Sequence, residues 1–537
     1  MTIIPVLVAT RGLVRDIQLR PAVDGVFEPI LANANTLLEA LGAIAKLGDN
    51  SQFDAELWSA SPYKPTPTII EAAQALYSHH SVAEISRSDA GAINLSRTTV
   101  RIFAIVDDAK ARNKKTLCLM TGVPGSGKTL AGLNIAIQRT DAHSEDHAVY
   151  LSGNGPLVAV LREALAQNQV VLSKEPGGSP VKKSDAKRRA SAFIQNIHHF
   201  RDECLKSEMA PVEKVVIFDE AQRAWNKAQA SSFMRQKRGV DDFDQSEPDF
   251  LLSAMDRHAD WCVVVCLVGG GQEINTGEAG VIEWLQTIQR KFPYWNVYCS
   301  DLIDSPEYSW GVDVKAILNK IHAHSEPDLH LSVSLRSYRA EHLAAFVSAV
   351  ISGDSVEAAK RLKEIPNYPI AVTRKLDTAR EWLREKARGS ERYGLVASSN
   401  ALRLKPHGVH VKSDIDPIMW FLKGKNDVRS ACSLEDVATE FAIQGLELDW
   451  VCLCWDANFR WNGDAWGTHE FVGTKWHNVH DENQQRYIAN AYRVLMTRAR
   501  QGLVIFVPPG DERDDTRVPS FYDGTYELLL ESGVPVL

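Results

Sequence analysis

The sequence predicts an α/β protein with two units of parallel β-sheet flanked by helices, preceded by a mainly helical N-terminal region. Two observations support this fold class. Short apolar runs alternate with amphipathic stretches from residue 115 onward, and the alternation falls into two series. Strands separated by helices are typical of parallel sheets. The length of 537 residues exceeds what one core usually supports, so we expect an N-terminal region at 1–110, a first α/β unit at 111–325 and a second at 326–537.

The N-terminal region shows a strand signal followed by helical periodicity. Its opening segment, residues 1–10, is apolar but contains Pro5 and has no basic leader, which indicates a strand rather than a signal peptide. Apolar residues then follow helical spacing at Val26–Leu47 and at Thr68–Tyr77. The proline-containing segment Pro65–Thr68 suits the entry to the second of these helices.

The strands of the two α/β units are predicted from short apolar runs, which have the length of buried strands. In the first unit we expect strands at Thr116–Met120, Ala148–Leu151, Lys214–Phe218, Cys262–Val268 and Val297–Cys299. In the second unit we expect them at Leu329–Leu335, Ile370–Val372, Gly394–Ala397, Trp450–Cys454 and Leu503–Val507, with the two units joined near residues 301–328.

Composition and charge exclude several classes of protein. The chain is 45% hydrophobic and 24% charged, and no apolar run approaches the 18 residues needed to span a bilayer, so we expect a cytoplasmic protein with no membrane partner. A net charge of -8 excludes a uniformly basic surface that coats nucleic acid, but it permits a protein that gathers positive charge in one groove. The eight cysteines lack CxxC spacing and are expected to be buried thiols rather than disulfides or zinc ligands.

A phosphate-binding loop is the sharpest motif in the sequence. It has the pattern G-x-x-x-x-G-K-[ST], directly after a predicted strand and directly before a predicted helix. Its glycines allow the backbone N–H groups to turn toward phosphate oxygens, and the helix adds its positive N-terminal end. Lys128 would bridge the β- and γ-phosphates of ATP, and the Thr129 hydroxyl would bind Mg²⁺. The nucleotide-binding residues are expected to be Gly122, Val123, Pro124, Gly125, Ser126, Gly127, Lys128, Thr129 and Leu130.

A pair of acids supplies what such a loop needs for hydrolysis. The apolar run Lys214–Phe218 ends at Asp219 and Glu220. Asp219 suits the Mg²⁺ shell, and Glu220 is placed to activate the attacking water. Alone, this pair could be an ordinary strand end that exposes two acids, but beside a complete phosphate loop it predicts hydrolysis of ATP as well as binding.

The segments that follow resemble the motifs of superfamily 1 helicases, in their usual order. The strand end with Asp219 and Glu220 looks like motif II, and the motif III segment departs from the usual pattern at Gly270, where an acid is common. Over residues 60–510 the chain resembles the bacterial Schlafen group 3-like DNA/RNA helicase domain family. The remaining motifs correspond to Leu267–Gly280 (motif III), Leu331–Ser337 (motif IV), Thr439–Asp449 (motif V) and Asn490–Arg500 (motif VI).

This resemblance implies two RecA-like domains that share one ATP site. It assigns Gln272 to sensing the γ-phosphate and Arg498 to stabilising its charge, with Arg336 in a similar role and Arg339 as the alternative to Arg336. An arginine supplied across a cleft strongly stabilises phosphoryl transfer, so closure of the two domains would depend on ATP. Besides the arginines, the nucleotide-contacting residues that the resemblance assigns are Gln272, Gly445 and Glu447.

The path of nucleic acid is less sharply marked. Ser152–Pro156 resembles motif Ia, which lies on that path, although a plain strand-to-helix turn would look the same. The aromatic residues between Trp450 and Trp476 could stack bases, but packing in the second core is favoured. Arg403 could touch the nucleic-acid backbone or the cleft. A basic cluster could hold phosphates or be a solvated helix face; its members are Lys182, Lys183, Lys187, Arg188 and Arg189.

We therefore expect an ATP- and Mg²⁺-dependent helicase or translocase that moves along single-stranded DNA or RNA. One alternative is a P-loop ATPase switch that controls a partner protein, such as a nuclease or another defence or repair protein. A weaker alternative is an inactive scaffold. Family members often carry a nuclease domain, and Ile3–Thr10 could be the last strand of such a module. The histidine pairs at 79–80 and 198–199 lack metal-ligand companions and are expected to be structural.

Overall fold

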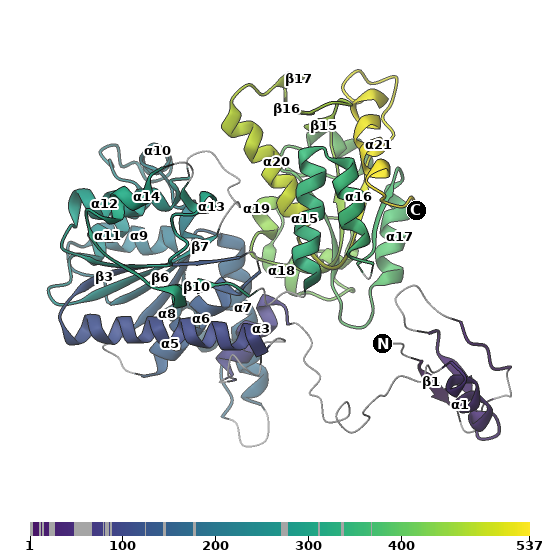
Figure 1. Ribbon diagram of the computed structural model, residues 1–537, viewed down its shortest axis with the longest axis horizontal. Coiled ribbons are helices and arrows are strands. Elements are labelled where there is room, and N and C mark those ends of the chain that lie inside the picture. The colour runs from purple at the N-terminus through teal and green to yellow at the C-terminus, as the bar shows by residue number, and fades with distance from the viewer. Residues whose placement is uncertain are drawn as a thin grey trace. The chain divides into compact units, whose positions relative to one another are not determined.

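The protein, seen in a computed structural model, consists of two compact parts (Figure 1). The N-terminal part is Met1–Tyr63 and the main part is Lys64–Leu537. The structure describes residues 4–9, 12, 16–20, 27–47, 67–78, 80, 85, 89–123, 125–142, 147–174, 179–269, 278–309, 312–333, 338–366 and 368–537.

The N-terminal part contains a small parallel β-ladder. Strand β1 (Val6–Val8) pairs with β2 (Ile30–Ala32), and helix α1 (Leu37–Ala45) follows. The strand expected in the opening segment is therefore confirmed within the described residues. The helix predicted over Val26–Leu47 is wrong in its first part, because the backbone of Ile30–Ala32 hydrogen-bonds to β1. Pairing with a distant strand outweighs local helical spacing there.

Two helices of the predicted N-terminal region belong to the main part. Helix α3 (Ile69–Tyr77) confirms the helix predicted at Thr68–Tyr77, and α5 (Asp89–Ala111) follows it. Thr68 caps α3: its hydroxyl accepts the Glu71 N–H at 3.1 Å while the Glu71 carboxylate accepts the Thr68 N–H at 2.7 Å. This capping box satisfies two backbone donors at the helix start.

The main part contains an eight-stranded sheet in which every pair is parallel. The strand order is β5-β4-β6-β7-β3-β8-β9, with β10 beside β3. We call this sheet, with its helices, the first lobe. Its strands are β3 (Lys115–Gly122), β4 (Ala148–Ser152), β5 (Ile194–Asn196), β6 (Val215–Asp219), β7 (Cys262–Gly269), β8 (Asn296–Cys299), β9 (His322–Ser325) and β10 (His330–Leu331).

Helices cover both faces of this sheet, with α5, α6 and α8 on one side and α9, α11 and α12 on the other (Figure 1). Alternate residues of one strand therefore enter different cores: Cys118 and Met120 join one hydrophobic cluster, while Leu117 and Leu119 join another. The helices are α6 (Lys128–Ala142), α7 (Gly155–Leu172), α8 (Lys183–Phe193), α9 (Ile197–Lys206), α10 (Lys227–Arg238), α11 (Glu247–Met255), α12 (Gly280–Lys291), α13 (Pro306–Ser309) and α14 (Val314–Leu318).

One predicted strand lies in the other sheet. The run Leu329–Leu335 was expected to open the second series, but His330 and Leu331 pair with Thr121 and Gly122 of β3. The joining segment 301–328 likewise contributes β9, whose polar sequence His-Ala-His-Ser gives no apolar strand signal. Edge strands need little apolar character, and only their backbone pairing places them. The domain boundaries at 110 and 325 remain predictions.

The second lobe contains a five-stranded parallel sheet of order β11-β18-β14-β12-β13 and a three-stranded antiparallel sheet of order β15-β16-β17. The prediction of two parallel α/β sheets is confirmed. The strands are β11 (Ile370–Thr373), β12 (Tyr393–Ala397), β13 (Val437–Thr439), β14 (Leu448–Cys454), β15 (Phe459–Trp461), β16 (Trp466–Val472), β17 (Lys475–Asn478) and β18 (Ala499–Phe506). The helices are α15 (Tyr338–Ser352), α16 (Ser355–Lys363), α17 (Leu376–Lys386), α18 (Pro417–Leu422), α19 (Glu440–Ile443), α20 (Glu482–Met496) and α21 (Asp523–Glu531).

Aromatic residues and cysteines fill the cores as expected. Trp455 and Phe459 are 1% exposed, and the Phe459 ring stacks on Trp466 with centroids 4.1 Å apart. These aromatic side chains therefore pack the second core. All eight cysteines are buried and free of disulfides. Within the described part of the chain, no helix is both long and apolar enough to cross a bilayer.

Candidate functional site

The phosphate loop connects β3 to α6 in the first lobe. Gly125 and Gly127 have φ angles of +76° and +86°, which glycine adopts without the clash that a Cβ atom brings. A Cβ atom on Gly122 would lie 2.6 Å from the Ser126 hydroxyl, so the loop has no room for a larger residue there. Ser126 is 1% exposed, and its hydroxyl has no hydrogen-bond partner among the described residues. A tightly curled loop with an unsatisfied hydroxyl fits the cradle of an anionic ligand.

The two residues that begin α6 bind different groups. The Lys128 ammonium donates to the carbonyl oxygens of Gly122 at 2.7 Å and Val123 at 3.2 Å, which keeps it folded over the loop. The Thr129 hydroxyl donates to the Asp219 carboxylate, 3.1 Å from the nearer oxygen. The loop and the acidic strand end are thus joined by a direct hydrogen bond. Pro124 lies outside the described residues.

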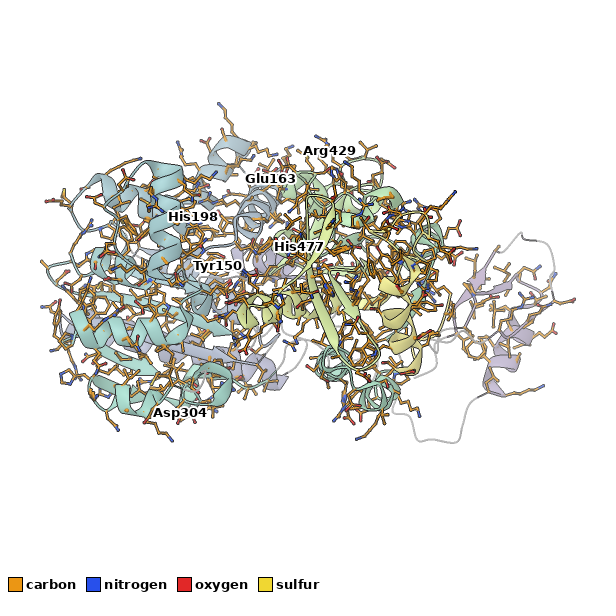
Figure 2. The ribbon with its side chains drawn as sticks, turned by 90° about the horizontal axis from the view of Figure 1, so that it is seen from above. Tyr150, Glu163, His198, Asp304, Arg429 and His477 are labelled. Carbon is orange, nitrogen blue, oxygen red and sulfur yellow. The ribbon has the colours of Figure 1, made fainter. Side chains whose placement is uncertain are left out.

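Asp219 ends β6 in a buried position, 3% exposed. Burial, followed by the negative charge of Glu220, raises the pKa of Asp219 above its ordinary value. The hydroxyls of Tyr150 and Thr129 both donate to this carboxylate, and they oppose the rise. Tyr150 lies in β4, inside the first lobe (Figure 2). A hydroxyl and a carboxylate are hard oxygen ligands, so Thr129 and Asp219 fit a magnesium ion.

Glu220 occupies a strained backbone position beside the loop. Its φ and ψ of 54° and 47° are left-handed, which costs a non-glycine residue about 1–2 kcal/mol. The Gln222 amide donates to the Glu220 carboxylate and accepts the Gly269 N–H at 2.9 Å. A Cβ atom on Gly269 would lie 3.2 Å from a Glu220 carboxylate oxygen and 3.6 Å from Lys128. The Glu220 carboxylate is therefore held in place at the loop.

Besides Pro124, two of the predicted site residues lie outside the described residues. Gln272 belongs to the segment 270–277, which starts directly after Gly269, and Arg336 belongs to the segment 334–337. Arg339 lies in the first turn of α15. The roles of these residues stay predictions.

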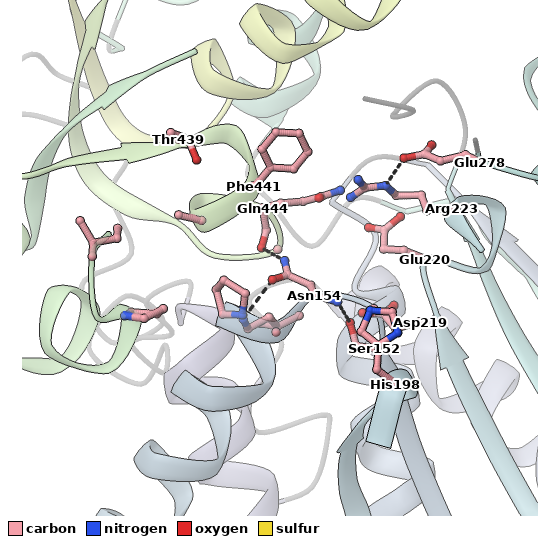
Figure 3. A pocket seen from close by; sticks show the side chains of 18 of the residues that line it. Ser152, Asn154, His198, Asp219, Glu220, Arg223, Glu278, Thr439, Phe441 and Gln444 are labelled. Atoms are coloured by element: carbon pink, nitrogen blue, oxygen red, sulfur yellow. Dashed lines mark hydrogen bonds and ion pairs between the residues drawn. The ribbon is translucent and has the colours of Figure 1, made fainter. Parts of the chain in front are cut away.

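A pocket of about 520 Å³ opens beside Asp219 and Glu220, and both lobes line it (Figure 3). The Ser152–Pro156 turn, predicted to lie on the nucleic-acid path, forms one wall. The first half of the motif V segment, Thr439 to Gly445, forms the facing wall, and we call it the motif V turn. The first lobe contributes Ser152, Asn154, Asp219, Glu220 and Arg223, and the second lobe contributes Thr439, Phe441, Gln444 and Gly445.

Asn154 joins the two lobes at this pocket. Its side-chain oxygen accepts the Leu157 N–H at 3.2 Å and caps α7, while its amide nitrogen donates to the Gln444 carbonyl oxygen at 2.5 Å (Figure 3). Gly445 follows with a φ of +73°, and a Cβ atom there would lie 3.0 Å from the Leu157 side chain. The motif V turn is therefore fitted closely to the first turn of α7.

The remaining motif V and VI residues lie deeper in the second lobe. Arg498 follows α20, is 5% exposed, and donates from Nε to the Val494 carbonyl oxygen at 3.2 Å. It is not among the residues that line the pocket. Glu447 is half-buried, one residue before β14. The nucleotide contacts predicted for Arg498, Gly445 and Glu447 stay predictions.

The basic cluster of α8 is largely paired within the protein. Lys183 and Lys187 bind the two carboxylate oxygens of Glu163 in α7, at 2.5 and 2.7 Å. Burial alone would raise the pKa of Glu163, but the hydrogen bonds from these lysines lower it to about 2. Arg188 pairs with Asp185 at 3.2 Å. These pairings favour a structural helix face for this cluster.

Two further candidates have partners inside their own lobes. Arg403 donates to the Asp514 carboxylate at 2.8 Å and lies over the Phe471 ring, 5.2 Å from its centroid. His198 lines the pocket between the rings of Trp225 and Phe233, with centroids 4.7 and 5.1 Å away. Burial lowers the pKa of His198 to about 4, so its ring is neutral near pH 7.

Three residues of the site were missed by sequence reasoning. Tyr150 interrupts an apolar strand with a polar tip, which was a usable signal. Gln444 directly precedes the predicted Gly445, but nothing in the sequence shows where its side chain points. Arg223 donates to Glu278 at 3.0 Å at the pocket wall, and that partner is 55 residues away in the chain.

Comparisons with known proteins bear on this architecture. No match was found among curated proteins. Among solved structures, the crystal structure of the Pyrococcus furiosus Hef helicase domain resembles the chain with 13% sequence identity and a TM-score of 0.25, and the match covers 77% of this chain and 96% of that chain. The model of the family described as Schlafen group 3, DNA/RNA helicase domain, matches residues 115–509, from the first residue of β3 to just beyond β18. The chain therefore belongs to the Schlafen group 3 DNA/RNA helicase domain family.

Proposed function

We propose that this protein is an ATP-dependent helicase or translocase, which hydrolyses ATP between its two lobes to move along single-stranded DNA or RNA. One observation carries the proposal. The phosphate loop, Asp219 and Glu220 lie on the first lobe, and residues of the second lobe from Thr439 to Gly445 line the pocket beside the two acids. Membership of a helicase family supports nucleic acid as the partner.

The phosphate loop would hold the nucleotide. The backbone N–H groups of Gly125 and Gly127 and the N-terminus of α6, which begins at Lys128, would attract phosphate. The Ser126 hydroxyl, which has no hydrogen-bond partner among the described residues, would gain one from such a ligand. Thr129 and Asp219 would hold Mg²⁺, which neutralises charge on the phosphates when bound. Lys128 would leave the loop carbonyls and bind the β- and γ-phosphates.

Glu220 would serve as the base for hydrolysis. Its carboxylate takes a proton from water as the water oxygen bonds to the γ-phosphorus, and the bond from that phosphorus to the bridging oxygen of ADP breaks. Gln222 keeps the carboxylate oriented during this step. Arg498, Arg336 and Gln272 would stabilise the charge on the γ-phosphoryl group, with Gly445 and Glu447 near the nucleotide.

The two lobes would move relative to each other because they share the ATP site. ATP favours the closed arrangement because groups of both lobes contact it, and hydrolysis removes the group that joins them. The Ser152–Pro156 turn would then shift against the second lobe while it contacts a nucleic-acid phosphate. We propose residues 111–325 and 326–537 as the two moving domains, except that residues up to Leu331 would move with the first domain because β10 pairs with β3.

A nucleotide-driven switch that controls a partner protein is the second candidate. The charge of the pocket lining is the observation that favours it. Acidic side chains outnumber basic ones there, which disfavours the phosphates of a nucleic-acid strand. The acids are Asp219, Glu220, Glu247, Glu278 and Asp414, and the bases are Arg223 and Lys412. A nuclease or another defence or repair protein would be the partner.

ATPase assays with Mg²⁺, with and without single-stranded DNA or RNA, test the proposal. We expect stimulation by at least one polynucleotide. Lys128→Ala should abolish nucleotide binding or turnover, while Lys114→Ala, an exposed lysine just before β3, should not. Glu220→Gln should retain binding but lose about 10²- to 10⁴-fold in turnover. Hydrolysis without stimulation by any polynucleotide would support the switch, and absence of hydrolysis in the unaltered protein would refute both.

A further inference from the structure

Gln444 places an unsatisfied amide at the pocket between the lobes. The residue is 4% exposed, and its Nε2 atom is buried without a hydrogen-bond partner in the described part of the chain. Gln444 lines the pocket together with Glu220 and Arg223, and its side chain extends toward these two residues (Figure 3). A buried amide without a partner destabilises the protein, so an acceptor that enters the pocket would gain a hydrogen bond from it.

The backbone of Gln444 is held on both sides. Its N–H donates to the Glu440 carbonyl oxygen at 3.1 Å, and its own carbonyl oxygen accepts from Asn154 at 2.5 Å. The next residue, Gly445, has a φ of +73°, and a Cβ atom there would lie only 3.0 Å from the Leu157 side chain. With its backbone held on both sides, Gln444 is fixed at the wall of the pocket that its side chain lines.

The acceptor that this amide lacks is available at the hydrolysis site. One oxygen of the Glu220 carboxylate already accepts from Gln222, which leaves the second oxygen and the attacking water as acceptors. We propose that Gln444 is a positioning residue, which the second lobe contributes to the hydrolysis site to hold the Glu220 carboxylate and the attacking water in line. This inference rests on the proposed ATPase activity and adds to it a residue through which the second lobe acts.

The same residue couples hydrolysis to the nucleic-acid path. The carbonyl oxygen of Gln444 is bound by Asn154, which caps α7 within the Ser152–Pro156 turn. A strand that displaces this turn therefore moves the Gln444 backbone, and with it the amide. Binding of nucleic acid would thus change the position of the Glu220 carboxylate through Asn154 and Gln444.

Single-turnover hydrolysis and nucleotide affinity, measured on the full chain, test the inference. Gln444→Ala keeps the backbone carbonyl that Asn154 binds, so only the amide is lost. We expect the rate of the chemical step to fall about 10- to 100-fold, as misplacement of reacting groups by about 1 Å does, while the affinity for a non-hydrolysable ATP analogue changes less than about twofold. Gln501→Ala is the matched control, because the Gln501 amide binds Glu391 at 3.0 Å within the second lobe.

A second variant, at Asn154, tests the same contact should Gln444→Ala fail to fold. Asn154→Asp retains the cap on α7 but removes the donor to the Gln444 carbonyl, so the fold-stimulation by single-stranded nucleic acid should fall. In the double variant the two effects should not add, since both act on one path. A Gln444→Ala rate equal to that of Gln501→Ala, or a loss of rate matched by an equal loss of affinity, would overturn the inference. Failure of the proposed function would appear separately, as an unaltered protein that hydrolyses no ATP.

Discussion

Replacing Tyr150 by phenylalanine removes one hydroxyl from the proposed magnesium site and nothing else. The ring is fully buried in β4, and α6 packs against it so closely that a Cβ atom on Gly132 would lie 3.2 Å from the ring. Phenylalanine fits the same space, so the sheet should be unchanged. Burial first, and then the charge of Asp219, raise the pKa of Tyr150, so the hydroxyl stays protonated and donates to Asp219.

The size of the effect follows from the partners of Asp219. Its carboxylate accepts from two hydroxyls, those of Tyr150 and Thr129, and metal binding by Thr129 would leave Tyr150 as the remaining anchor. A hydrogen bond to a charged group contributes about 1.5–3 kcal/mol. At about 1.4 kcal/mol for each tenfold change, the Mg²⁺ affinity should fall about 10- to 100-fold, the usual range for a residue that orients a metal ligand.

The assay is a Mg²⁺ titration of the binding of a fluorescent ATP analogue, repeated at a Mg²⁺ concentration that saturates the variant. Tyr298→Phe, in β8 of the same sheet and separated from β4 by β6, β7 and β3, is the control for loss of a tyrosine hydroxyl. Nucleotide binding without Mg²⁺ should be equal in the two variants. A half-saturating Mg²⁺ concentration for Tyr150→Phe within about twofold of the control would refute the role assigned to Tyr150.

Three further predictions concern the second lobe, its contact with the first lobe and the pairing of α7 with α8. Arg498→Ala should lower turnover much more than nucleotide affinity, because the contact proposed for it would form mainly in the transition state; steady-state kinetics with a parallel loss of both would contradict this. Gly445→Ala should destabilise the protein by more than Gly463→Ala in urea unfolding, because both have a positive φ but only Gly445 also lies against a neighbouring side chain. Left-handed backbone accounts for about 1–2 kcal/mol in each, so equal losses would show that the close fit is unimportant. Glu163, with a pKa of about 2 in the folded state, contributes stability above its unfolded pKa that is lost as the pH falls from about 4.5 toward 2. Glu163→Gln should lower stability at pH 7 by about 1.5–3 kcal/mol and flatten this pH dependence, and an unchanged acid transition would count against the pairing with Lys183.

Much of the fold was readable from local patterns. Apolar runs predicted nine of the observed parallel strands, eight of them to within two residues at each end, because a buried strand needs consecutive apolar side chains; the ninth, β18, begins four residues before its prediction. The pattern failed at Ile30–Ala32, where the backbone pairs with β1, and at the polar edge strand β9. It also assigned His330 and Leu331 to the wrong sheet. In each case a pairing partner far along the chain decided the structure.

The sequence by itself determined the local chemistry of this protein: the phosphate loop, the acidic pair at 219–220 and the order of the helicase motifs, since each depends on residues that are neighbours in the chain. Only the tertiary structure decided which distant groups complete that chemistry. It placed the Tyr150 hydroxyl on Asp219 and fitted Gly445 against Leu157. Strand order and the contact between lobes are set by packing and hydrogen bonds over long sequence separations, and these leave no spacing rule in the sequence that local reasoning could follow.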